Sequence, residues 1–130
     1  KQTAEIISKI IKVPVKDPFE GLNEYRGGYL RSKMKILFNK RLKRLKKFLK
    51  KISKDREKTK TILIVAHGIT NRIIIGYLLQ IPLKKQLLFF RQHNTAVNSI
   101  FWSKLYHNWN MESMNDVSHL PRKLITKVKI

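Results

Sequence analysis

One short segment constrains the fold more than any other part of the chain. Five apolar residues, Ile62 to Ala66, run directly into His67-Gly68, and a second apolar run begins at Ile73. A short apolar run bounded by a glycine turn indicates a buried parallel strand that feeds a helix. His67 would then lie at the carboxyl end of the strand, beside the helix start, where α/β sheets bind ligands and helices attract phosphate. The alternative is a histidine that merely closes the strand–helix turn.

The size and composition of the chain fit one globular domain. The sequence has 130 residues and 42% hydrophobic residues, which is enough for a single core and argues against general disorder. We expect the domain to cover residues 1–120 and a basic tail to cover 121–130. The chain has no cysteine, which excludes disulfides and thiolate metal sites. No signal peptide is visible, and the apolar stretches are too short to cross a bilayer, so a cytoplasmic location is expected.

Periodicity indicates the following order of elements: helix, loop, helix, strand, helix and two further strands. The fold class that this order predicts is α/β, a three-layer α/β/α sandwich with a mostly parallel sheet that is incomplete at the N-terminus. Trp102 and Trp109 flank the final turn and predict cross-strand packing. The expected helices are 2–12, 33–54 and about 71–80, and the expected strands are 62–66, 97–102 and 109–114.

The charge of the chain is strongly basic and unevenly spread. The net charge is +21, and residues 31–60 carry 15 Lys or Arg against two acids. Within the expected helix 33–54, apolar residues recur every three or four positions and the opposite face is cationic. That face is either a solvated surface or a binding surface for RNA or for an anionic membrane. The candidate basic residues are Lys40, Arg41, Lys43, Arg44, Lys46, Lys47 and Lys50.

Several separated motifs, in one order, resemble the histidine phosphatase superfamily, also called phosphoglycerate-mutase-like. The motif Val65-Ala66-His67-Gly68, with Arg72 and the run from Gly76 to Leu83, resembles the family's second catalytic histidine and the helix that follows it. Each short motif alone is weak, but their common order strengthens the resemblance. The other matching segments are Gln2–Ile7, Gly21–Glu24 with Gly28 and Leu30, Asn94–Val97 and Asn115–Leu120.

The resemblance implies a phosphoric monoester hydrolase of the phosphatase branch, acting through a phosphohistidine. A histidine near the N-terminus attacks phosphorus, while a second histidine and two arginines hold the phosphoryl oxygens. On this sequence His67 would be the second histidine, and the backbone N–H groups of Gly68 and Ile69 would add phosphate contacts. Glu24 would be the general acid that protonates the leaving alcohol. Neither a metal nor an organic cofactor is implied.

The sequence departs from the family at its nucleophile. The family carries that histidine in an Arg-His-Gly motif, and the one His-Gly of this chain is His67-Gly68. The expected explanation is that the chain is the C-terminal portion of such a protein and is inactive alone. The alternative is a degenerate, non-catalytic homologue whose basic surface binds RNA, as part of a ribonucleoprotein, or an anionic membrane. The short segment between Glu24 and His67 favours a small phosphate ester as substrate.

Overall fold

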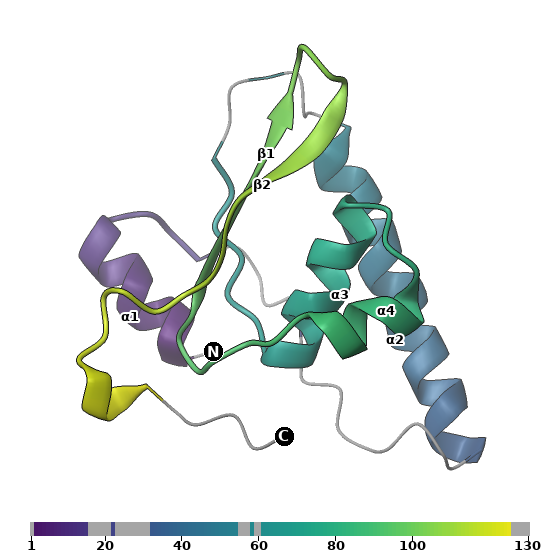
Figure 1. The fold of residues 1–130 in the computed structure, drawn as a ribbon, viewed down its shortest axis with the longest axis horizontal. Helices are drawn as coiled ribbons and strands as arrows, with labels where there is room; N and C mark the ends of the chain where they lie inside the picture. Colours follow the sequence, from purple (N-terminus) through teal and green to yellow (C-terminus); the bar gives the residue numbers. More distant parts are fainter. Residues whose placement is uncertain (1, 16–21, 23–31, 55–57, 59–60, 126–130) are drawn as a thin grey trace.

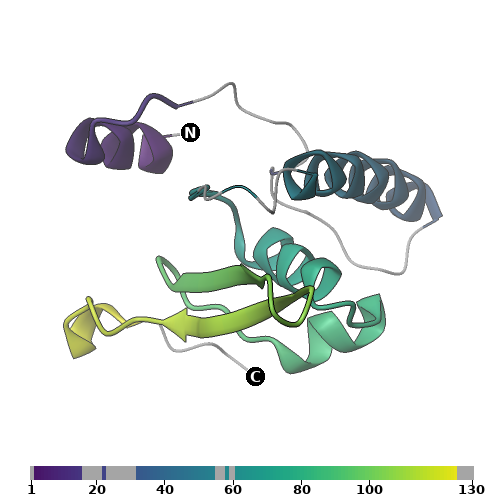
Figure 2. The same ribbon diagram turned by 90° about the horizontal axis from the view of Figure 1, so that it is seen from above.

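The computed structural model describes residues 2–15, 22, 32–54, 58 and 61–125. In this part of the chain the protein is α/β: a two-stranded antiparallel sheet has three helices, α2, α3 and α4, gathered beside it, and α1 lies apart from them (Figures 1 and 2). The elements are α1 (Gln2–Ile11), α2 (Ser32–Ser53), α3 (Gly68–Leu78), α4 (Leu83–Phe89), β1 (Val97–Ser103), β2 (Asn108–Asp116) and the 3-10 helix η2 (Arg122–Leu124).

The core lies between α2 and α3. Leu45 and Leu49 of α2 are completely buried, and they form one cluster with Ile73, Ile74 and Leu78 of α3. The spacing of four residues places both leucines on one face of α2. This confirms the predicted apolar stripe, because the stripe docks on a neighbouring helix rather than facing solvent. The half-buried side chains of the hairpin that pack against this cluster are Ile100 and Trp109.

The C-terminal hairpin forms as predicted, with slightly longer strands. β1 and β2 pair antiparallel, and Trp102 lies opposite Trp109. Their ring centroids are 5.6 Å apart at an interplanar angle of 70°, an edge-to-face arrangement that aromatic pairs favour. His107, in the turn, has a left-handed backbone with φ 47°. The predicted cross-strand packing of the two tryptophans is therefore confirmed.

The helices agree with the predicted ranges to within a few residues, except that α4 was not predicted. Pro82 ends the preceding turn and is the N-cap of α4. Proline favours helix starts because its fixed φ suits a helix and its missing N–H is not needed there. The inward face of α4 carries the polar Gln86 beside the half-buried Leu83, and its seven residues are too few to show a clear helical repeat.

The predicted parallel strand at 62–66 is not present. Residues 61–67 have neither helix nor strand, and Ile62 and Leu63 are 41% and 59% exposed. A strand needs a neighbouring strand to take up its N–H and C=O groups, and no other described segment pairs with this one. The sheet of the described residues is therefore a single antiparallel hairpin, and the parallel three-layer sandwich is not formed by them.

Candidate functional site

His67 stands at the start of α3 with its side chain in solvent. It is the N-cap residue, its backbone is extended (φ −103°, ψ 161°), and its carbonyl oxygen accepts the N–H of Asn71 at 2.8 Å. Within the described part of the chain its imidazole makes no capping hydrogen bond, and the residue is exposed. The ring is therefore available to a ligand. This argues against a histidine whose only role is to close the turn.

The first turn of α3 adds backbone donors beside this ring. The first hydrogen bond within the helix runs from the N–H of Asn71 to the carbonyl oxygen of His67. The N–H groups of Gly68 and Ile69 come before it and therefore have no carbonyl partner within the helix. These groups carry the positive end of the helix dipole, which favours an anion. Gly68 and Ile69 are half-buried next to the exposed His67. One imidazole and two amides thus lie on three consecutive residues.

A polar cluster holds the neighbouring segment against Gly68. A Cβ atom on Gly68 would lie 3.6 Å from the Cβ of Gln92, so Gln92 lies close beside the start of α3. Gln92 is 8% exposed, and its amide pairs reciprocally with the amide of Asn98, at 3.0 Å and 2.9 Å. The Oδ1 atom of Asn98 also accepts the N–H of Asn115 at 2.9 Å. The cluster therefore ties the α3 start to both strands of the hairpin.

His93 belongs to the same cluster. The Oδ1 atom of Asn115 accepts the N–H of His93 at 2.7 Å, and the Nδ2 atom of Asn115 lies 2.7 Å from the Nδ1 atom of that ring. An amide nitrogen can only donate, so the ring accepts at Nδ1 and, when neutral, carries its proton on Nε2. Asn115 holds this position with φ 55°, a backbone region that asparagine tolerates.

Comparison with protein families decides the relationship. The family model of the histidine phosphatase superfamily (branch 1) matches residues 37–117. The chain belongs to this superfamily. Neither the curated proteins nor the solved structures give a match. The superfamily match covers α2 from residue 37 onward, the segment around His67, α3, α4 and both strands, so the predicted family is confirmed.

Two of the motifs that suggested the superfamily lie before the matched range. The Gln2–Ile7 motif falls in α1, which buries none of its residues. The proposed acid, Glu24, lies outside the described residues. Leu22, close to it in sequence, is described and packs against the core cluster. The roles of these N-terminal motifs stay predictions, whereas His67 lies inside the matched range.

The predicted basic residues of α2 divide into two sets. Arg41 is half-buried, on the side of α2 that carries Leu45. The remaining residues are exposed, and Lys51, which the sequence analysis did not name, is exposed with them. Helical periodicity was sufficient to find Lys51, because it lies one turn after Lys47. The exposed set is Lys40, Lys43, Arg44, Lys46, Lys47, Lys50 and Lys51.

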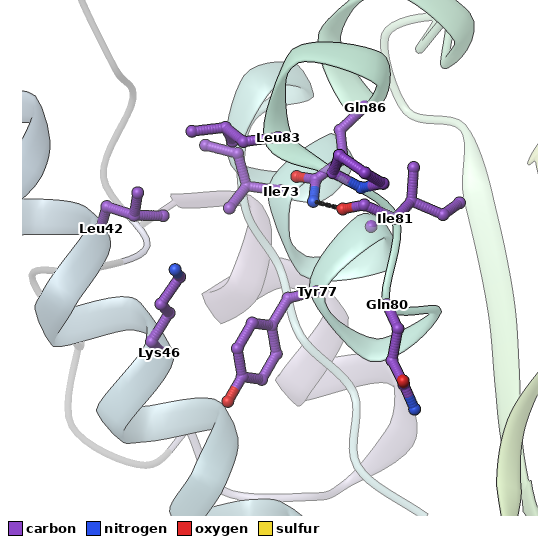
Figure 3. A pocket seen from close by; sticks show the side chains of 10 residues that line it. Leu42, Lys46, Ile73, Tyr77, Gln80, Ile81, Leu83 and Gln86 are labelled. Carbon is purple, nitrogen blue, oxygen red and sulfur yellow. Dashed lines mark hydrogen bonds between the residues drawn. The ribbon is translucent and has the colours of Figure 1, made fainter.

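A separate cavity lies between α2, α3 and α4 (Figure 3). Its volume is about 380 Å³, and Lys46 and Tyr77 border it from α2 and α3. Gln86 enters it from α4, and its Nε2 atom donates to the carbonyl oxygen of Ile81. The other lining residues are Leu42, Ile73, Gly76, Gln80, Pro82 and Leu83. His67 is not among the lining residues, so this cavity is distinct from the α3 start.

Neither a metal-binding cluster nor a membrane-spanning helix occurs among the described residues. They contain no group of three or more His, Cys, Asp or Glu side chains that could hold a metal ion. No helix among the residues that the structure describes is long and apolar enough to cross a membrane.

Proposed function

We propose that this chain supplies the phosphoryl-binding part of a phosphoric monoester hydrolase. The observation that carries the proposal is the exposed imidazole of His67 at the start of α3, inside the segment that matches the histidine phosphatase superfamily. The amides of Gly68 and Ile69 support it, because fixed donors stabilise charge that develops on a transferring phosphoryl group. The substrate would be a small phosphate ester.

The proposed reaction has two steps. A histidine nucleophile forms a nitrogen–phosphorus bond while the bond from phosphorus to the ester oxygen breaks, and Glu24 gives its proton to the leaving alcohol. Water then attacks the phosphohistidine and gives a proton to the Glu24 carboxylate while the nitrogen–phosphorus bond breaks, which releases inorganic phosphate and restores both the nucleophile and the acid. In both steps His67, Gly68 and Ile69 donate hydrogen bonds to the phosphoryl oxygens.

The nucleophile itself is proposed to come from a different segment, since Arg-His-Gly does not occur in these 130 residues. Such a segment would also provide a strand beside residues 62–66 and complete a three-layer sandwich with a parallel sheet. We propose a cytoplasmic hydrolase with its domain over 1–120 and a basic tail over 121–130. The 130-residue chain alone would bind phosphate without turning over an ester.

Hydrolysis of an aryl phosphate by the protein expressed from the complete reading frame tests this proposal. We expect His67→Ala to lower kcat about 100- to 1000-fold, as for the loss of one charge-stabilising donor. His107→Asn is the matched control, because it removes an exposed ring from the hairpin turn and asparagine tolerates the left-handed backbone there. Equal activity of His67→Ala and His107→Asn would refute the role of His67.

A second candidate function is favoured by the exposed cations of α2. If the superfamily fold is kept here without catalysis, this surface would bind a polyanion, either a nucleic acid or an anionic membrane. The supporting observation is that the described outer side of α2 presents basic side chains over several turns, while its apolar side is buried.

A further inference from the structure

We infer that α2 binds the phosphate backbone of a nucleic acid rather than a membrane. The inference rests on the second candidate function and is independent of hydrolysis. It concerns the lysine face, which we define as the exposed lysines on the side of α2 away from α3: Lys40, Lys43, Lys47, Lys50 and Lys51.

The lysine face is continuous and carries no compensating acid. At 100° per residue, its members cover the side of α2 opposite Leu45 and Leu49, which are completely buried. The acids among the described residues are Glu5, Glu112 and Asp116, and none of them lies on α2, α3 or α4. Like charges three and four residues apart destabilise a helix, so the isolated face stores repulsion that a polyanion relieves.

The buried stripe of α2 argues against a membrane. A helix that lies in a bilayer surface inserts its apolar side between the lipids. The apolar side of α2 is already occupied, because Leu45 and Leu49 pack in one cluster with Ile73 and Leu78 of α3. What α2 presents to solvent over residues 39–51 is polar or cationic throughout. The face can therefore attract phosphates but has no side chain to anchor in hydrocarbon.

The placement and length of α2 suit a nucleic-acid strand. Figure 2 shows α2 as an outer layer, with α3, α4 and the hairpin all on one side of it. From Lys40 to Lys51 the helix rises about 16 Å, which matches about five phosphates along one strand of a duplex. Lysine offers a point charge rather than a fork that reads base edges. The face would thus bind backbone without sequence preference.

Fluorescence anisotropy with a labelled 20-base-pair RNA duplex tests the inference on the 130-residue chain. We expect log Kd to change with log salt concentration with a slope of about 4 to 5, from about five phosphate contacts. The variant Lys43→Glu/Lys47→Glu/Lys50→Glu should bind at least about 100-fold more weakly. The control Lys84→Glu/Lys104→Glu/Lys123→Glu makes the same change in net charge at exposed lysines outside α2. Its affinity for RNA should fall only a few-fold.

Three further measurements separate the outcomes. Single-stranded RNA and duplex DNA at equal salt identify which phosphate backbone the face prefers, and binding to any of them supports the inference. Sedimentation with phosphatidylserine vesicles distinguishes the membrane, and vesicle binding without nucleic-acid binding would overturn the inference while leaving the second candidate function intact. Equal losses in the two triple variants, or no binding at low salt to either nucleic acid or vesicles, would overturn both the inference and the second candidate function.

Misfolding cannot explain the expected loss. In a variant that carries only Lys47→Glu, the side chain at position 47 attracts Lys43, Lys50 and Lys51 instead of repelling them. That single variant should melt at a higher temperature than the unmodified chain while binding RNA more weakly. A lower melting temperature would contradict the charge repulsion on which the inference depends.

Discussion

Gly76 on α3 is the residue at which the packing of α3 against α4 can be tested most sharply. In a helix interior, changing glycine to alanine normally stabilises a protein by about 1 kcal/mol, because alanine loses less backbone entropy on folding. Here a Cβ atom at position 76 would overlap the Cγ and Cδ atoms of Gln86 and lie 2.6 Å from its Nε2 atom. Gln86 is 5% exposed, and its side chain can move aside only into the adjoining cavity, away from its hydrogen-bond partner Ile81.

The structure therefore predicts that Gly76→Ala destabilises the protein. Overpacking a core position costs about 1–3 kcal/mol. Displacing Gln86 also breaks the hydrogen bond from its Nε2 atom to Ile81, worth about 1 kcal/mol. Against the helix gain of about 1 kcal/mol, the expected net loss in the free energy of unfolding is about 1–3 kcal/mol.

Urea unfolding followed by circular dichroism measures this loss, and a second background isolates its cause. In the Gln86→Ala protein the obstructing side chain is gone, so adding Gly76→Ala should stabilise that protein by about 1 kcal/mol. Gly76→Ala should thus lower the free energy of unfolding when Gln86 is present and raise it in the Gln86→Ala protein. If Gly76→Ala stabilised the unmodified protein by the same amount, α4 would not be packed on α3 as described.

Two further predictions concern the core and the end of the hairpin. Leu49→Ala should lower the free energy of unfolding by about 2–5 kcal/mol, since this side chain is fully buried, whereas Leu88→Ala, at 76% exposure, should change it by less than about 0.5 kcal/mol. The hydrogen bond from the N–H of Ser118 holds the pKa of Asp116 below its ordinary value of 3.8. A carboxyl group whose pKa is lower in the folded state stabilises that state at pH values above the ordinary pKa. This contribution to stability is lost as the pH falls through the folded pKa, so the unfolding midpoints of the unmodified chain and Asp116→Asn should converge in acid.

Sequence periodicity predicted the parts of the fold that depend on local order. The stripe through Leu45 and Leu49 fixes which side of α2 is buried, and the two strand-forming runs on either side of the final turn, with Trp102 and Trp109 flanking it, indicate the hairpin. Each of these patterns depends on neighbours close in sequence, so the sequence alone carries the information. The bond from the N–H of Ser118 to the side chain of Asp116, two residues before it, is a local contact of the same kind.

The parts that were wrong or not foreseen depend on distant partners. The apolar run at 62–66 predicts burial but does not reveal whether another strand pairs with it, and in the described residues none does. Helix α4 was not predicted because it is short and the polar residue Gln86 lies on its buried face. At the candidate site, the spacing around His67 predicted an accessible ring at a helix start. No local pattern indicated the pairing of Gln92 with Asn98, which joins segments through side-chain amides.

The central claim is that the start of α3 binds a phosphoryl group, and nuclear magnetic resonance with inorganic phosphate tests it directly. Titrating the labelled chain at about 0.15 M salt suppresses loose attraction to exposed lysines. We expect saturable shifts of the Gly68 and Ile69 amides and of the His67 ring, retained in His107→Asn and lost in His67→Asn. Shifts confined to the lysines of α2, or shifts at Gly68 that persist unchanged in His67→Asn, would contradict the assignment.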